Sequence, residues 1–166
     1  TSSKTTATPC LRYRANCMDI CEISMNNLLR GDDVDHLDFL YRADSLKELG
    51  KTVLITRMTR FDRLSELLGH FTREPIAISL SIGLLNELFK EKWTRDIPGG
   101  ILESFGRTFQ HKTRLYVSPW LNRKSGEFVT ARTFRAPEQY QYLYQHFLAN
   151  NLVIDVPFFN ETLLRK

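Results

Sequence analysis

The chain has 166 residues, of which 42% are hydrophobic and 25% are charged. This length and composition fit one ordinary globular domain and exclude a disordered chain. No apolar stretch approaches 18 residues, which excludes a membrane-spanning helix, and three cysteines are too few for a disulfide scaffold. The net charge of +4 is compatible with an anionic partner without requiring one.

The chain begins with the polar segment TSSKTTATP and has no initiator Met. We expect residues 1–12 to form a flexible arm. Removal of a targeting sequence would explain such a start, which leaves an organelle or the secretory route open as locations. Near the other end, Asn160-Glu161-Thr162 fits the glycosylation sequon, although the same residues suit an ordinary helix start.

The first predicted elements are helices within residues 13–50. A stripe at three- and four-residue spacing predicts a helix over 14–30, and it consists of Cys17, Ile20, Cys21, Ser24 and Leu28. A second helix follows, with Val34, Leu37 and Tyr41 on one face and Asp32 or Asp33 as its cap. A further short helical turn runs from Asp44 to Leu49.

Cys17 and Cys21 would lie on one face of the first helix, four residues apart. Such a pair fits burial in the core as small apolar side chains, a disulfide, or a shared metal ion. The spacing differs from the two-residue gap of zinc ribbons, and no His lies nearby, so we favour burial. Cys10 belongs to the predicted arm.

From residue 52 onward, short β-branched or apolar runs alternate with segments of helical spacing. Strands are predicted at 52–56, 76–82, 115–117 and 152–154, and helices at 61–71, 84–93, 101–109 and 137–150, with a last short helix near Thr162. The polar turn 122–126 and the alternating residues 128–134 predict a β-hairpin with the strand at 115–117.

This order predicts an α/β fold with a mixed, mostly parallel sheet of about five strands. Strand–helix–strand connections imply parallel pairing, helices on both faces, and an antiparallel edge hairpin, with the N-terminal helices in front. We expect three segments: a flexible arm at 1–12, N-terminal helices at 13–50, and an α/β domain at 51–166 that forms one globular unit with those helices.

No known catalytic motif is present: the glycines build no phosphate-binding loop, no His pair has zinc-protease spacing, and no Ser lies in a nucleophile elbow. The sequence therefore assigns no catalytic residue, cofactor or metal ligand. The acid-rich segment 32–38 is the best candidate for a hard cation. It also suits the positive end of a helix, and we favour that interpretation.

A basic segment from 107 to 135 contains one acidic residue, Glu127. Its basic residues are Arg107, Lys112, Arg114, Arg123, Lys124, Arg132 and Arg135. Strand alternation would place Arg132 on the same hairpin face as Phe128 and Thr130. Such a surface suits RNA or another anionic partner, and it equally suits an edge hairpin whose charges prevent pairing with other chains.

The following helix carries Tyr140, Tyr142 and Tyr144, which cannot all face one core. At least one ring is expected on the surface. Because tyrosine is enriched at protein interfaces, the three residues are candidates for contacts with other protein subunits.

The segment TVLITRMTRFDRLSELLGHFTREPIAISLSI, residues 52–82, resembles the opening strand–helix–strand of LARGE-type glycosyltransferases. In that family, a Val-rich strand and a helix with Asp-Arg-Leu precede a strand that contains Pro-Ile. The resemblance implies a sugar-nucleotide fold with a divalent metal held by an Asp-x-Asp motif at a strand end. In this chain the Asp-x-Asp sequence is Asp33-Val34-Asp35, before the first predicted strand.

Three functions therefore stay open. We favour a non-catalytic α/β subunit or binding module that acts through surface contacts in a larger assembly. The alternatives are a glycosyltransferase-like enzyme or an inactive remnant of one, and an RNA-binding domain that uses the basic segment.

Overall fold

The computed structural model describes residues 17–24, 29–30, 33–34, 36–121, 126–157 and 159. The chain divides into two units, Thr1–Thr59 and Arg60–Lys166, so the boundary follows the strand at 52–56 rather than preceding it. Helices and strands occur in both units, which confirms the α/β class. Within the described ranges, no helix is long and apolar enough to cross a bilayer.

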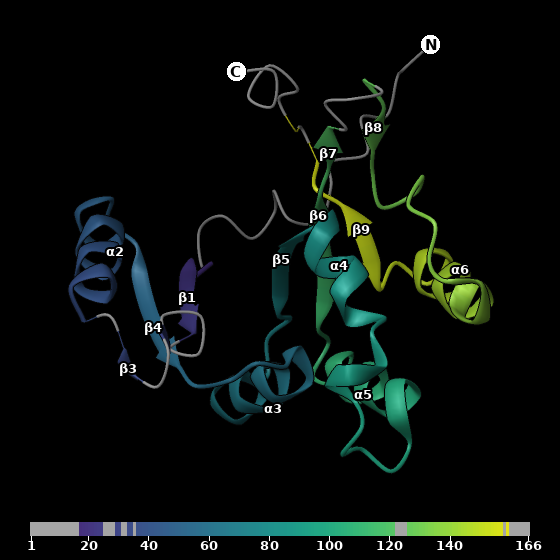
Figure 1. The fold of residues 1–166 in the computed structure, drawn as a ribbon, viewed down its shortest axis with the longest axis horizontal. Coiled ribbons are helices and arrows are strands. Elements are labelled where there is room, and N and C mark those ends of the chain that lie inside the picture. The colour runs from purple at the N-terminus through teal and green to yellow at the C-terminus, as the bar shows by residue number, and fades with distance from the viewer. Residues whose placement is uncertain are drawn as a thin grey trace. The chain divides into compact units, whose positions relative to one another are not determined.

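The N-terminal unit is built on a parallel pair of strands, β1 (Ile20–Ser24) and β4 (Thr52–Thr56). Parallel strands need a crossover connection, and α2 (His36–Glu48) lies in that connection and packs against β4 (Figure 1). Before α2, β2 (Leu29–Arg30) and β3 (Asp33–Val34) form a short antiparallel pair.

The helix expected over 14–30 is wrong at Ile20–Ser24, which is a strand. The apolar residues there do have helical spacing. They form a strand because all five residues pair with β4. The β-branched side chains of Ile20 and Ile23 also suit a strand. The two short helices expected after residue 34 are one continuous helix, α2.

The cysteine prediction changes with this strand. Cys17 lies before β1 and is exposed, whereas Cys21 lies within β1 and is half-buried. Both are free thiols. Burial of the pair on one helix face is therefore wrong. Cys10, the predicted arm, Asn160 and the predicted last helix lie outside the described residues.

The C-terminal unit contains a parallel sheet in the order β5–β6–β9 (Figure 1). Its strands are β5 (Ala77–Ser81), β6 (Arg114–Ser118) and β9 (Val153–Asp155). Its helices are α3 (Phe61–Phe71), α4 (Ile82–Leu88), α5 (Gly100–Thr108) and α6 (Gln141–Ala149), with 3₁₀ turns η2 (Glu91–Trp93) and η3 (Glu138–Tyr140). These elements confirm the predicted order to within a few residues.

The predicted sheet of about five strands is wrong for the described residues, because β4 pairs with β1 and the sheet of β5 has three strands. The prediction that helices cover both faces of the sheet is also wrong at β5. Ile78 and Leu80 are buried against the helices, whereas Ala77, Ser79 and Ser81 on the opposite face are exposed. The core of the C-terminal unit therefore lies on one face of its sheet.

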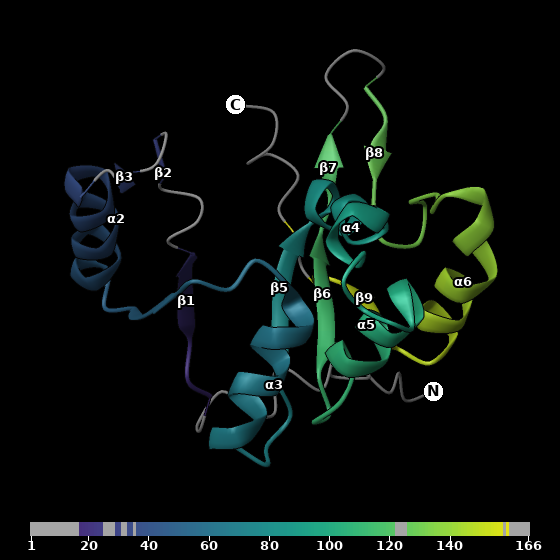
Figure 2. The same cartoon turned by 60° about the horizontal axis from the view of Figure 1, so that its bottom comes forward.

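A short hairpin forms here, but its first strand is not the predicted 115–117, which belongs to β6 and lies between β5 and β9. β7 (Trp120–Leu121) and β8 (Phe128–Val129) pair in antiparallel fashion beyond the end of β6 (Figure 2). The strand expected to continue to residue 134 ends at Val129, because Thr130 and Thr133 bond to each other and close a turn. Arg132 lies in this turn, so its predicted place on a strand face with Phe128 is wrong.

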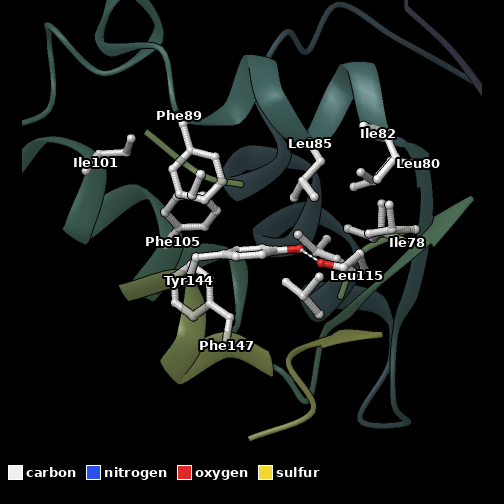
Figure 3. Packing of buried hydrophobic residues seen from close by; sticks show 14 of the residues in the cluster. Ile78, Leu80, Ile82, Leu85, Phe89, Ile101, Phe105, Leu115, Tyr144 and Phe147 are labelled. Carbon is white, nitrogen blue, oxygen red and sulfur yellow. Dashed lines mark hydrogen bonds between the residues drawn. The ribbon is translucent and has the colours of Figure 1, made fainter. Parts of the chain in front are cut away.

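The centre of the core is a group of aromatic side chains from α5, from α6 and from Phe89, which directly follows α4 (Figure 3). The ring centroids of Phe105 and Phe147 are 4.8 Å apart, and those of Phe89 and Phe105 are 5.1 Å apart. Leu85 and Leu115 are fully buried beside them. Apolar burial of this kind is the main source of stability in a unit of this size.

Helix α3 is fixed by polar contacts as well as by packing. The hydroxyls of Ser65 and Thr113 are both buried and lie 2.7 Å apart. Gly69 lies so close to His111 that a Cβ atom would be 2.4 Å from the imidazole Cγ. These contacts hold α3 against the loop that precedes β6.

An ion pair lies at the start of α3, between Arg60, the residue before the helix, and the buried Asp62 in its first turn. Asp62 is 1% exposed, and Arg60 donates to both of its carboxylate oxygens, at 3.0 and 2.5 Å. The hydrogen bond to Asp62 raises the pKa of the Arg60 guanidinium. This two-point geometry is the strong form of an Arg–carboxylate contact.

Candidate functional site

The N-terminal unit has a cavity between β1 and α2 that can hold a ligand. Its volume is about 420 Å³, which lies in the roughly 300–1,000 Å³ range of ligand pockets. It is lined by Glu22, Ile23, Ser24, Tyr41, Arg42, Ser45 and Leu46. No sequence pattern indicates a site here.

The orientation of α2 creates this cavity and the apolar surface beside it. Phe39, Ala43 and Leu46 are half-buried at four- and three-residue spacing, so they form the inner side of the helix. Because this side faces inward, the predicted apolar residues Leu37 and Tyr41 point outward. Leu37 is 80% exposed and Tyr41 is 74% exposed. We call the exposed side chains of Leu37, Leu40 and Tyr41 the α2 apolar face.

Hydrogen bonds within the unit hold the polar side chains of the cavity in place. Ser24 Oγ donates to the Met58 carbonyl oxygen over 2.9 Å, and Ser45 Oγ donates to the Tyr41 carbonyl oxygen over 2.7 Å. Thr56 Oγ1 donates to Glu22 Oε1 over 2.5 Å. The Glu22 carboxylate thus keeps one oxygen that accepts no hydrogen bond from the described residues.

One cation lines the cavity. Arg42 Nη2 lies 2.9 Å from Asp38 Oδ2, one helical turn away. The negative charge of Asp38 offsets that of the guanidinium, so Glu22 supplies the remaining charge of the cavity wall. Together with Ile23 and Leu46, this arrangement can bind a group that is apolar in one part and cationic in another.

The five predicted basic residues that the structure describes come from different parts of the C-terminal unit. Lys112 and Arg114 lie at the amino end of β6, whereas Arg132 lies by Asp155, which pairs with Val117 near the carboxyl end of β6. Arg107 and Arg135 belong to α5 and to the segment after β8. Arg123 and Lys124 lie outside the described residues.

Two of these basic side chains already have acidic partners. Arg107 Nη2 lies 2.5 Å from Glu103 Oε1, and Arg132 Nε lies 3.5 Å from Asp155 Oδ2. Glu103 also accepts a hydrogen bond from the Gly99 N–H group, which lowers the pKa of that carboxyl. Such pairing reduces the charge that the segment offers to an anionic partner.

The three predicted tyrosines have different environments. Tyr142 is 86% exposed, which confirms that at least one ring lies on the surface. The Tyr140 hydroxyl donates to Glu91 Oε1 over 2.9 Å. Burial is the main cause that raises the pKa of Tyr140, and the hydrogen bond to Glu91 raises it further. Tyr144 is buried, and only Tyr142 therefore offers a whole ring for contact.

Tyr144 connects the core to the turn that carries Arg132. Its hydroxyl donates to the Ala131 carbonyl oxygen over 2.5 Å (Figure 3). Burial, and secondly the negative charge of Asp155, raise the pKa of the Tyr144 hydroxyl. Asp155 in turn accepts a hydrogen bond from the Ala131 N–H group over 2.6 Å. The turn is therefore held from both sides.

A polar sheet edge in the C-terminal unit was also missed from the sequence. Ser81 lies opposite Ser118, and Asp155 lies opposite Val117, so three polar residues stand where parallel strands end. Ligands of open parallel sheets bind at this edge. The signal in the sequence was a polar residue within one position of the end of each predicted strand: Ser81 in 76–82, Ser118 after 115–117 and Asp155 after 152–154.

The described residues contain no group of three or more His, Cys, Asp or Glu side chains placed to hold a metal ion. Asp38 lies in the first turn of α2, as expected for an acid at a helix start. Asp32 and Asp35 are outside the described residues.

No protein-family model, curated protein or solved structure matches this chain.

Proposed function

We propose that this chain is a non-catalytic α/β binding module that acts through surface contacts with other protein subunits of a larger assembly. The observation that carries the proposal is the α2 apolar face. Leu37, Leu40 and Tyr41 stand at i, i+3 and i+4 on one helix and are 80%, 51% and 74% exposed.

Three adjacent apolar side chains on a short helix are an uncommon use of exposed surface. Helix faces with this spacing bind grooves of partner proteins through apolar anchors. Tyrosine also contributes strongly to interface energy because its ring is large and its hydroxyl stays hydrogen-bonded. Tyr142 in the C-terminal unit is a second exposed ring of the same kind.

The test replaces the α2 apolar face. We expect the triple variant Leu37→Ser, Leu40→Ser, Tyr41→Ser to bind less than about one tenth of the partner protein that the wild type binds. The loss of a single hot-spot side chain can weaken binding by more than tenfold. The measurement is quantitative co-purification from the cells that produce the protein, with circular dichroism as the folding check.

The matched control changes three exposed charged residues of the same helix, Asp44→Ser, Lys47→Ser and Glu48→Ser. It should retain partner binding within about twofold, because exposed charges contribute little to affinity. Equal binding by the two triple variants would count against the α2 apolar face as the contact surface.

A second candidate, sugar-nucleotide binding, is favoured by the polar edge at Ser81, Ser118 and Asp155. This candidate extends the resemblance of residues 52–82 to LARGE-type glycosyltransferases. A uridine sugar nucleotide, with or without Mn²⁺, should then raise the unfolding temperature, because a ligand that binds only the folded state stabilises it. An unchanged unfolding temperature at millimolar ligand would reject this candidate. RNA binding has less support, since the basic residues are divided between the two ends of β6.

A further inference from the structure

We propose that the cavity between β1 and α2 binds an extended peptide segment of a partner protein, in which a Lys or Arg stands beside a large apolar residue. The inference rests on the proposed function and names the kind of partner segment that the module takes. Its basis is the chemistry of the cavity wall, which differs from that of the α2 apolar face.

The apolar part of the cavity comes from both of its walls. Ile23 of β1 and Leu46 of α2 are half-buried and line the cavity, so neither completes its packing within the unit. Tyr41 also lines it and belongs to the α2 apolar face. A ligand that places a large apolar side chain against these residues removes their exposed area from water.

The charged part of the cavity favours a cation. Glu22 has one carboxylate oxygen bonded to Thr56 and a second that accepts nothing from the described residues. The positive charge of Arg42 is offset by Asp38 at 2.9 Å. A Lys or Arg of a ligand would therefore meet the Glu22 carboxylate, and the exposed Tyr41 ring adds a favourable surface for it.

The shape of the lining favours an extended chain. Glu22, Ile23 and Ser24 are consecutive in β1, and successive strand residues point to opposite faces. A cavity lined by all three therefore reaches the strand backbone. Among the described strands, β1 pairs only with β4. A peptide that lies along the other edge can add backbone hydrogen bonds, as in strand addition to a sheet.

The ligand is a polypeptide rather than a small cation because the cavity and the α2 apolar face share Tyr41. A segment of several residues can fill the cavity with one side chain and continue over Leu37 and Leu40. A small molecule would cover only the cavity.

The experiment selects peptides from a phage-displayed library of random dodecapeptides on the immobilised full chain. Selected sequences should carry a Lys or Arg next to a large apolar residue. Fluorescence anisotropy then measures the affinity of the selected peptides. Ser45→Arg, which fills the cavity from α2, should weaken binding at least tenfold. Glu22→Gln keeps the oxygen that Thr56 bonds and removes the charge, and should weaken binding about fivefold.

Lys47→Gln is the control, because Lys47 is exposed on the same helix and does not line the cavity. Its affinity should stay within twofold of the wild type. Failure of any sequence to enrich on the wild type over Ser45→Arg would overturn the inference, as would selected peptides without a basic residue. The proposed function is judged separately by the α2 apolar face variants, so a bound partner together with no selected peptide would reject this inference alone.

Discussion

Replacement of Leu85 by Ala is expected to lower the free energy of unfolding of the C-terminal unit by about 3 kcal/mol. Leu85 lies in α4, has no exposed surface and packs in the core beside Phe89. The smaller side chain loses apolar contact with its surroundings and leaves a cavity that the close-packed core cannot fill. The measurement is urea unfolding followed by circular dichroism.

Leu84→Ala is the matched control, since it removes the same atoms from the preceding residue of the same helix. Leu84 is 46% exposed, so its replacement should cost less than about 1 kcal/mol. Equal losses for the two variants would contradict the arrangement of α4, because they would mean that both side chains are equally buried.

Replacement of Arg60 by Met should destabilise the C-terminal unit by about 3 kcal/mol. The change removes the partner of Asp62, which is 1% exposed and receives both of its side-chain ion-pair bonds from Arg60. A buried carboxylate without a partner is costly, although the amino end of α3 offsets part of the loss. Chemical denaturation at neutral pH gives the value.

Two further variants define the cause of that loss. Arg63→Met removes an exposed partner of Glu66 on the same helix and should cost less than about 0.5 kcal/mol. The double variant Arg60→Met, Asp62→Leu replaces the pair by apolar side chains and should recover most of the stability. A double variant as unstable as Arg60→Met alone would show that the buried charge is not the source of the effect.

The elements that the sequence predicts best are those with strong local patterns. β4 agrees with the β-branched run 52–56, and α3 agrees with the apolar spacing of Phe61, Leu64 and Leu68. In both segments the local preference and the tertiary environment favour the same structure, so one sequence window contains enough information.

The predictions fail where contacts with residues distant in the sequence determine the structure. β1 became a strand because it pairs with β4, about thirty residues away, and its own spacing of Cys17, Ile20 and Cys21 is equally compatible with a helix. The spacing of Leu37 and Tyr41 correctly indicated a helix but not which side is buried. Phe39, Ala43 and Leu46 occupy that side instead.

The candidate site could not be predicted for the same reason. The cavity joins residues of β1 and α2 that are about twenty positions apart, and a single sequence contains no signal that brings Glu22 and Ser45 to one wall. The basic segment was visible because its charges fall within one stretch of the sequence, 107–135. Their positions at both ends of β6 depend on the sheet, which composition does not specify.

The native mass of the particle that contains the wild-type chain tests the central claim most directly. A module that works through the α2 apolar face should be found, in a freshly prepared extract at physiological salt, in a particle well above the 19.4 kDa of the chain. Light scattering coupled to size exclusion gives this mass. Recovery of the wild-type chain at 19.4 kDa would contradict the account.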